Sequence, residues 1–279
     1  MLVYLNGAFL PADQARISPF DRGFLFGDGV YEVVRYFNRR PVRLRPHIER
    51  LARSMREIQL TGFDAELLGP VGEELLLREE LSDASIYWQV TRGVEATRRH
   101  VPAREMTPTV FAYAESTPSL DECREPRRMK AILYDDIRWG RGDIKSISLL
   151  GGLLGKLAAR DAGGDEAIFH RDGLLTEGGA TNVIVVDRAG IARTPPLAGA
   201  GRILDGITRG LVLEVAPEIR VEPIRVDSLG SSREVLLIGT RTFVGSVIEL
   251  EGQRVGEGIP GPFARELNRR LVARLRAEA

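Results

Sequence analysis

A segment rich in Pro, Ser and Glu, from Ser116 to Pro126, divides this 279-residue chain into two halves. Each half contains both strand-like and helix-like stretches, and neither contains a repeat or a low-complexity tract. Such a segment between two stretches that are each long enough to bury a core is typical of an interdomain linker. The sequence therefore predicts an α+β protein with a small domain at 1–117, a linker at 118–126 and a larger domain at 127–279.

The first half opens with Asn6-Gly7 between two short apolar runs, which predicts a β-hairpin. Residues 29–37 are β-branched and aromatic and predict a strand, which turns and returns through Val42 and Leu44. Pro46 then begins a helix whose apolar residues recur at helical spacing. The other elements expected in this half are a helix at about 65–80 and strands at 86–91 and 109–113.

The second half alternates predicted strands with three predicted helices. The helices are expected at about 148–162, after 206–208, and at 262–277. The strands are expected at 129–134, 167–169, 174–176, 181–186, 191–194, 219–226, 234–238 and 247–250.

Composition limits the classes of partner. Lys plus Arg and Asp plus Glu both total 39, so no net charge favours nucleic acid or an anionic membrane. The start of the chain lacks the charged region of a signal peptide, and no apolar stretch is long enough for a membrane span. Cys123 is the single cysteine and cannot form an internal disulfide. We therefore expect a cytoplasmic protein that acts on small molecules.

Lysine is scarce, which directs attention to its chemistry. Only three of the 39 basic residues are lysines, namely Lys130, Lys145 and Lys156. Lysine alone offers a primary amine that can lose its proton and form a Schiff base with a carbonyl. Lys145 stands out because an apolar run follows it, and this run is expected to draw it toward the interior. Lys130, at a strand edge, and Lys156, on a helix, need no functional explanation.

The sequence does not contain three common functional motifs in complete form. Gly151 to Lys156 lacks both the first glycine and the hydroxyl residue after the lysine that a phosphate loop requires. His47, His100 and His170 are far apart in sequence and have no cysteine partners, so a zinc site is not expected. A Gly-x-Ser-x-Gly sequence, which would indicate a serine hydrolase, is absent.

Three other features fit one cofactor. Glu177 ends a short predicted strand before two glycines, although a solvated hairpin residue would fit the same pattern. Gly206-Ile207-Thr208-Arg209 opens a helix whose free N–H groups can hold a phosphate, and Arg50 can supply a cation. A Schiff-base lysine, a carboxylate and a phosphate cradle together are what pyridoxal phosphate requires.

Several motifs together resemble the fold type IV pyridoxal phosphate enzymes. They are Asp21 to Glu32, Asp136 to Trp139, Asp143 to Ser146, Thr176 to Gly178 and Gly206 to Arg209. The resemblance spans nearly the whole chain, with the motifs in order. Within this class, Val90 to Gly93 followed by Arg98-Arg99-His100 looks most like the D-amino acid aminotransferases. The resemblance implies a small N-terminal α/β domain, a larger C-terminal pseudo-barrel domain, and transamination of D-amino acids with 2-oxo acids.

The resemblance also implies roles for individual residues. Lys145 would hold the cofactor as a Schiff base and move the substrate α-proton, and Glu177 would face the pyridine nitrogen. Tyr31, Arg98 and His100 would bind the substrate carboxylate, the last two from the partner subunit of a homodimer. The remaining cofactor contacts implied are those of Arg50, Ile207, Thr208 and Thr240 with the phosphate and of Arg138 near the phenolic oxygen.

The chain departs from the family pattern at four positions. Gly179 and Ala180 stand where relatives often carry serines, which removes one hydrogen bond near the phosphate side. Arg241 stands in a turn that is richer in hydroxyls elsewhere, and Thr97 replaces a proline before the carboxylate-binding arginine. These departures leave the cofactor assignment intact and weaken the assignment of substrate.

Four alternatives remain open from the sequence. A branched-chain L-amino acid aminotransferase, an (R)-amine transaminase and an aminodeoxychorismate lyase would share the fold. The lyase would not need the Arg-x-His pair, and the branched-chain enzymes differ at the Gly239-Thr240-Arg241 turn. A non-catalytic carrier of pyridoxal phosphate is the fourth alternative, and the carboxylate-binding candidates argue against it.

Overall fold

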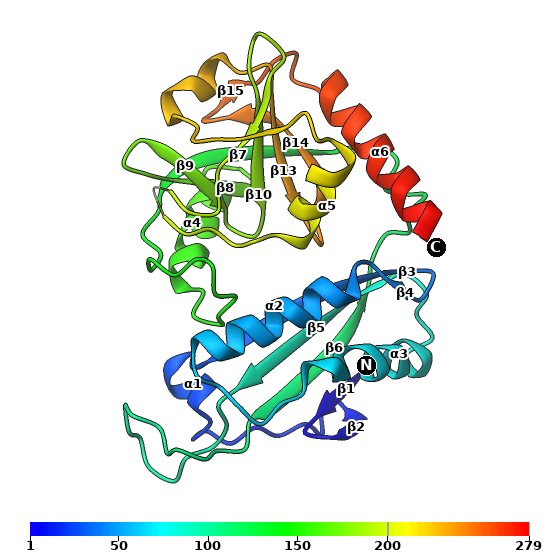
Figure 1. The fold of residues 1–279 in the computed structure, drawn as a ribbon, viewed down its shortest axis with the longest axis vertical. Coiled ribbons are helices and arrows are strands. Elements are labelled where there is room, and N and C mark those ends of the chain that lie inside the picture. The colour runs from blue at the N-terminus through cyan, green and yellow to red at the C-terminus, as the bar shows by residue number, and fades with distance from the viewer. Residues whose placement is uncertain (200, 279) are drawn as a thin grey trace. The chain divides into compact units, whose positions relative to one another are not determined.

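The computed structural model describes residues 1–199 and 201–278, which form two compact units (Figure 1). Unit 1 comprises Met1–Ser119 together with Ile144–Ser148. Unit 2 comprises Leu120–Asp143 together with Leu149–Ala279. The segment Ile144–Ser148 therefore packs with unit 1, although it lies well inside the second half of the sequence.

The described residues of unit 1 form one antiparallel sheet of six strands, in the order β2-β1-β6-β5-β3-β4. The strands are β1 (Leu2–Leu5), β2 (Ala8–Pro11), β3 (Gly29–Phe37), β4 (Arg40–Pro41), β5 (Ala84–Thr91) and β6 (Thr109–Ser116). The helices are α1 (Arg22–Phe26), α2 (Leu44–Glu57), the 3-10 turn η1 (Ala65–Leu67) and α3 (Leu68–Arg78).

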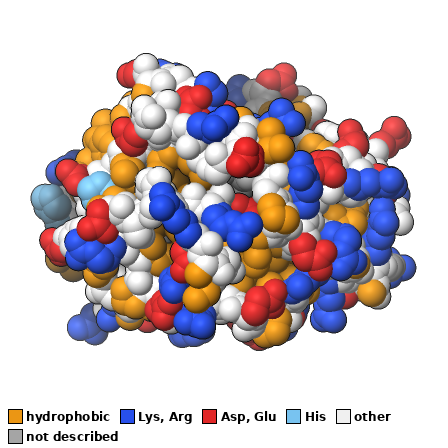
Figure 2. Space-filling view, turned by 90° about the horizontal axis from the view of Figure 1, so that it is seen from above, with side chains coloured by type: hydrophobic (Ala, Val, Ile, Leu, Met, Phe, Trp, Pro, Cys, Tyr) orange, Lys and Arg blue, Asp and Glu red, His pale blue; other side chains and the backbone are white. Residues whose placement is uncertain are grey.

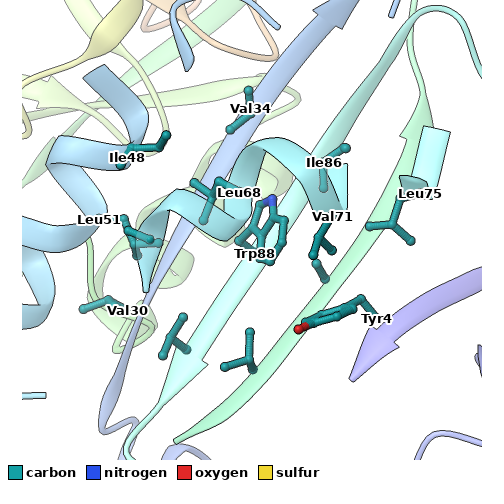
Figure 3. Close-up of a cluster of buried hydrophobic side chains, with 14 of the residues drawn as sticks. Tyr4, Val30, Val34, Ile48, Leu51, Leu68, Val71, Leu75, Ile86 and Trp88 are labelled. Carbon is teal, nitrogen blue, oxygen red and sulfur yellow. The ribbon is translucent and has the colours of Figure 1, made fainter. Parts of the chain in front are cut away.

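The core of unit 1 lies between its sheet and helices α2 and α3. The side chains of alternate residues in β3 and β5 point to this face, as the two-residue period of a strand requires. Trp88 in β5 is fully buried at its centre. Figure 3 shows part of this cluster and labels Tyr4, Val30, Val34, Ile48, Leu51, Leu68, Val71, Leu75, Ile86 and Trp88.

The described residues of unit 2 form a mixed sheet of nine strands, in the order β12-β11-β10-β13-β14-β7-β8-β9, with β15 paired to β14. The strands are β7 (Arg127–Asp135), β8 (Glu166–Arg171), β9 (Leu174–Gly178), β10 (Asn182–Val186), β11 (Ala192–Thr194), β12 (Arg220–Val221), β13 (Glu234–Gly239), β14 (Phe243–Leu250) and β15 (Gln253–Arg254). The helices are α4 (Leu150–Asp161), α5 (Ile207–Val215), the 3-10 helix η2 (Val226–Ser231) and α6 (Pro262–Glu278).

The sheet of unit 2 curls back on itself. The Gly178 amide at the end of β9 donates to the Thr181 carbonyl before β10 (2.7 Å), so an end strand meets a strand near the other end of the order. A side chain at Gly178 would collide with the Thr181 hydroxyl, which explains the glycine there. Strand β10 is buried along its whole length.

Helix α4 is packed with its small residues inward. Its buried residues are Gly152, Gly155 and Ala159. A Cβ atom at Gly155 would lie 2.6 Å from the Phe169 ring, so the helix can approach strand β8 this closely only with glycine at that position. The leucines of α4 are consequently left on its outer face, where Leu150 is 71% exposed.

Four local features differ from the sequence-based expectations. Leu44 begins α2 instead of ending a strand, which places Pro46 in the first helical turn, where its missing N–H costs nothing. The strand expected over 219–226 is reduced to β12, because Pro223 cannot donate to a ladder. Helix α1 was not expected. The apolar run after Lys145 is not drawn inward, since Leu150 is exposed.

The surface agrees with the balanced composition. On the face shown in Figure 2, basic and acidic side chains are interspersed, in keeping with a formal net charge of zero. Among the described residues, no helix combines the length and apolar character needed to cross a bilayer.

Candidate active site

Lys145 is fixed to strand β3 by backbone hydrogen bonds. The Tyr31 amide donates to the Lys145 carbonyl (2.9 Å), and the Ile147 amide donates to the Gly29 carbonyl (3.1 Å). The Lys145 Nζ atom lies 4.0 Å from the centroid of the Tyr31 ring, a distance at which cation and ring attract. The structure thus brings together two of the residues that the sequence analysis selected.

Lys145 differs from the other lysines in its partners. The Nζ atoms of Lys130 and Lys156 lie 3.1 Å and 3.2 Å from the carboxylates of Glu249 and Glu166. Over residues 1–199 and 201–278, Lys145 has no carboxylate partner of this kind. Its amine is therefore not occupied by a salt bridge and is available to a ligand.

A buried charged cluster lies on the opposite face of β3 from Tyr31. Glu32 is fully buried and accepts hydrogen bonds from Arg50 Nε (2.6 Å) and Arg50 Nη2 (2.9 Å), and it lies 2.7 Å from His47 Nδ1. Burial alone would raise the pKa of Glu32, but Arg50 and His47 hold that pKa far below its ordinary range. Burial lowers the pKa of His47.

This cluster fixes the position of Arg50, the predicted phosphate ligand. Its guanidinium is bound on two atoms by a single carboxylate, a geometry that arginine satisfies and lysine cannot. No role was expected for Glu32 from the sequence, although it lies in the motif from Asp21 to Glu32. The signal that was available is a charged residue at an inward position of an otherwise apolar strand.

In unit 2, Glu177 is buried near the end of β9. It accepts hydrogen bonds from Arg138 Nη1 (2.8 Å), Asn182 Nδ2 (3.2 Å) and the Leu204 amide (3.1 Å). Burial raises the pKa of Glu177 because it outweighs the opposing effect of Arg138. Glu177 is therefore not the solvated hairpin residue that its local sequence also allowed.

Arg138 is placed by a second carboxylate. Asp136 accepts hydrogen bonds from Arg138 Nε (2.9 Å) and Arg138 Nη2 (2.9 Å), and from Thr176 Oγ1 (2.9 Å). The Arg138 guanidinium also lies 4.6 Å from the centroid of the Phe169 ring. Arg138 and Glu177, two of the predicted site residues, thus form one ion pair whose geometry Asp136 and Phe169 fix.

The N-terminus of helix α5 begins near Glu177. Asn182 Nδ2, which donates to Glu177, also donates to the Leu204 carbonyl (3.1 Å), and a side chain at Gly206 would collide with Asn182 Oδ1. No side chain caps this helix, so the amides of Ile207 and Thr208 in its first turn are not used by a side-chain cap. Such a helix end favours an anion.

Thr240 lies in the turn that joins β13 to β14. A Cβ atom on the preceding Gly239 would lie 3.1 Å from the Ala180 carbonyl, so this turn runs beside the connection between β9 and β10. The residues predicted around the cofactor in unit 2 therefore come from the ends of neighbouring strands and from the start of α5. Asn182, which links Glu177 to this helix, was missed because nothing in its local sequence marks it.

Arg98 and His100 lie in the exposed loop between β5 and β6. The Arg98 Cζ atom lies 4.7 Å from the centroid of the Phe26 ring, and the His100 ring lies 5.7 Å from it. Phe26 thus brings these two predicted residues together. Within the single chain, the ring of Tyr31 contacts Tyr87 and Lys145. In the described part of the chain it contacts neither Arg98 nor His100.

The chain is similar to known proteins over most of its length. Residues 29–250 match the family described as amino-transferase class IV. The chain is 37% identical over 277 residues to a D-alanine aminotransferase from Bacillus licheniformis, covering 97% of this chain and 96% of that protein. It is 36% identical over 270 residues to a D-alanine aminotransferase from Staphylococcus haemolyticus, covering 95% of this chain and 94% of that protein.

The structure is similar to a solved branched-chain amino acid aminotransferase from Escherichia coli. The TM-score is 0.87 at 23% identity, and the match covers 96% of this chain and 92% of that one. It is also similar to a hypothetical aminotransferase from Mycobacterium tuberculosis in its pyridoxal-phosphate-bound form. That TM-score is 0.84 at 21% identity, and the match covers 100% of both chains.

These matches establish the family. The chain belongs to the class IV aminotransferases. It is a pyridoxal-phosphate-dependent enzyme with the fold type IV architecture. The predictions of fold class, enzyme class and cofactor are confirmed.

The buried carboxylate of Glu32 gives a test of stability. Changing Glu32→Gln removes the buried negative charge that pairs with Arg50 and lies beside His47, and we expect the free energy of unfolding to fall by about 3–5 kcal/mol. Urea denaturation checks this loss. Glu49→Gln on the same helix as Arg50 is the control, because the Glu49 side chain is 62% exposed in its pair with Arg45 and its loss should leave the midpoint nearly unchanged.

The same variant should change the dependence of stability on pH. Since the folded-state pKa of Glu32 lies below the ordinary value of 4.5, its stabilising contribution is present above pH 4.5 and is lost as the pH falls toward the folded-state value. The Gln variant should lack this part of the acid dependence. If the pH profiles of the two proteins run parallel, Glu32 is not ionised in the folded state.

Proposed function

We propose that this enzyme transfers the amino group of D-amino acids to 2-oxo acids in two alternating half-reactions, with substrates of the D-alanine and D-glutamate type. The observation that carries the proposal is Lys145, a lysine fastened to β3 whose amine lacks a salt bridge within the described part of the chain. The preference for D-amino acids is supported by the two D-alanine aminotransferases that share 36% and 37% identity over nearly the whole chain.

The donor set fits pyridoxal phosphate. Two uncapped amides at the start of α5, those of Ile207 and Thr208, suit a phosphate, and Thr240 and Arg50 add a hydroxyl and a fixed guanidinium. Arg138 would lie near the phenolic oxygen. When bound, the cofactor supplies an aldehyde that captures amines and a ring that withdraws electrons from the substrate α-carbon.

Lys145 and Glu177 would perform the acid–base work. The Lys145 Nζ atom would bind the cofactor and, once released by substrate, take the proton from the substrate α-carbon and return it on the cofactor side. Glu177 would keep the pyridine nitrogen protonated. Its burial supports this role, because a carboxylate in a desolvated site stabilises a neighbouring positive charge more strongly than one in water.

Tyr31, Arg98 and His100 would bind the substrate carboxylate. Arg98 offers a planar fork of donors that matches a carboxylate, and the tyrosine hydroxyl and imidazole add hydrogen bonds. Arg98 and His100 would act on the active site of the partner subunit, so the active enzyme would be a homodimer. The small unit would then be the domain that carries the carboxylate-binding residues, and the larger unit the one that holds most of the cofactor.

The exposed leucines of α4 support the homodimer. Leu150, Leu153, Leu154 and Leu157 recur at helical spacing and are between 41% and 71% exposed. A continuous apolar stripe on the outer face of a helix is costly in water and marks a surface that another protein covers. We propose that a second copy of the chain covers this stripe. The single Cys123, which is a free thiol, suits a cytoplasmic enzyme.

The alternatives have less support. The branched-chain structure shares 23% identity, which supports the fold and not the substrate. An (R)-amine transaminase or a lyase acting on aminodeoxychorismate would leave the Arg98 and His100 pair without a use. A non-catalytic carrier would have no use for the carboxylate-binding candidates Tyr31, Arg98 and His100.

Lys145 is tested by chemical trapping. Borohydride reduction of the yellow holoenzyme should fix the cofactor on one peptide, the one that contains Lys145, and mass spectrometry locates it. Lys145→Ala should lower the rate of the half-reaction with D-alanine by at least about 10²- to 10⁴-fold, the usual contribution of a positioned base. Lys156→Arg is the control and should behave as the wild type. Recovery of the label on Lys156 or Lys130 would refute the assignment.

Arg98 is tested through substrate discrimination. Arg98→Ala should lower kcat/KM for D-amino acids. The expected decrease corresponds to a loss of about 2 to 4 kcal/mol of transition-state stabilisation, the cost of losing a charged partner from a desolvated pair. An (R)-amine without a carboxylate should lose much less. Arg99→Ala is the control, since the Arg99 side chain is exposed and its Nε atom donates to Thr97 Oγ1 (3.2 Å). Equal losses for both substrates would mean that the carboxylate is bound elsewhere, with Arg241 as the next candidate.

The proposed dimer surface is tested by one charged substitution. Leu153→Glu places a carboxylate in the centre of the leucine stripe, and light scattering after size-exclusion chromatography should show the mass of a single chain instead of two. Activity should fall with dissociation. Leu77→Glu on α3 is the matched control, because Leu77 is 54% exposed against 53% for Leu153. A dimer that survives Leu153→Glu at low micromolar concentration would exclude this stripe as the interface.

A further inference from the structure

The loop that carries Arg98 and His100 is fastened to helix α1. Arg22 is the first residue of α1, and its side chain is 4% exposed. Its Nη1 atom donates to the Arg99 carbonyl (2.6 Å), and its Nη2 atom donates to the His100 carbonyl (3.0 Å). One buried guanidinium therefore holds two consecutive backbone carbonyls of an otherwise exposed loop.

Arg22 is itself fixed by carboxylates. Its Nε atom donates to Asp28 (2.8 Å) and its Nη1 atom donates to Glu95 (3.0 Å). Asp28 also receives two hydrogen bonds from Arg92, at 2.8 Å and 2.9 Å. Arg92 in turn donates to the carbonyl of Ile58 (2.6 Å), just after helix α2. The loop is thus connected through an unbroken network to a helix of the core.

The side chain of Arg98 is held differently, by the aromatic ring of Phe26. Its Cζ atom lies 4.7 Å from the centroid of the Phe26 ring, and Arg22 contacts the same ring at 4.7 Å. Within residues 1–199 and 201–278, Arg98 has no carboxylate partner. A guanidinium that stacks on a ring uses its face, and its N–H groups, which lie in the plane of the group, remain free to donate.

We propose that Phe26 and Arg22 are positioning residues for recognition of the substrate carboxylate. Phe26 orients the Arg98 guanidinium and the His100 ring without consuming their donors, and Arg22 sets the path of the backbone beneath them. This inference rests on the proposed function, because it gives Arg98 and His100 the carboxylate as their ligand. It adds two residues, neither of which contacts the substrate, to the determinants of specificity for amino acids.

The test is made at Phe26, because its replacement leaves the buried hydrogen bonds of Arg22 in place. Phe26→Leu removes the ring, and Phe26→Tyr retains it. Phe24→Leu, on the same helix, is the matched control, since Phe24 is 77% exposed. Each protein is assayed as the pyridoxal-phosphate-loaded holoenzyme for the KM of D-alanine, for inhibition by propionate, and for the rate at which hydroxylamine reacts with the cofactor.

Phe26→Leu should raise the KM for D-alanine and the inhibition constant of propionate by about 3- to 30-fold, the range expected for loss of one cation–π contact. The hydroxylamine rate should stay unchanged, because hydroxylamine has no carboxylate. Phe26→Tyr and Phe24→Leu should both match the wild type. A general structural defect would alter all three measurements together.

Two outcomes separate this inference from the function on which it rests. If the wild type transaminates D-alanine and Phe26→Leu leaves its KM and the propionate constant unchanged, or changes the hydroxylamine rate equally, only the positioning role is refuted. If the wild-type holoenzyme transaminates no D-amino acid, the proposed function and the inference fail together.

Discussion

Two backbone hydrogen bonds between β3 and the segment around Lys145 are the interaction on which the proposed chemistry of unit 1 depends. Strand β4 pairs with β3 only at Tyr36 and Phe37, so the first residues of β3 have a free edge. The segment with Lys145 fills this edge instead of a strand. Because side chains alternate along a strand, the same element then presents Tyr31 beside the lysine on one face and Glu32 to the core on the other.

The two buried glutamates of the site show how surroundings set charge. Glu32 accepts hydrogen bonds from both Arg50 and His47, and together these lower its pKa in spite of burial. Glu177 is equally buried but has one arginine, and burial outweighs that arginine and raises its pKa. The first carboxylate is therefore a fixed anion that holds Arg50 in place. The second has a single arginine partner, so a protonated ring nitrogen bound beside it would add a second positive charge and favour the ionised form of Glu177.

Much of the fold could be predicted from local sequence, because its long elements have strong periodicity. Strand β3 lies at Gly29–Phe37, as expected, and α6 lies at Pro262–Glu278 against an expected 262–277. Short elements were missed. Helix α1 has five residues and no apolar period, and its only local signals are Asp21, which caps its start, and Gly27, which ends it with a positive φ of 65°.

The site was harder to predict wherever a residue acts through a distant neighbour. Lys145 could be selected from composition, and the residues proposed to bind the carboxylate and the phosphate could be selected from the family resemblance. Asn182 and Phe26 could not, because their roles depend on contacts with groups far away in sequence, such as the Leu204 carbonyl and the Arg98 side chain. Local sequence shows which residue types are available for a site, but the fold determines which of these residues are in contact.

The unequal use of arginine and lysine follows from the same contacts. Arg22 serves four acceptors at once, and Arg50 binds one carboxylate through two nitrogens. An ammonium group has no planar fork and could not reproduce either geometry. Arginine, in turn, cannot give up its proton and attack a carbonyl. A chain that uses fixed cations to build its framework thus favours arginine at those positions. At Lys145, where the proposed reaction needs an amine that can become a nucleophile, only lysine can serve.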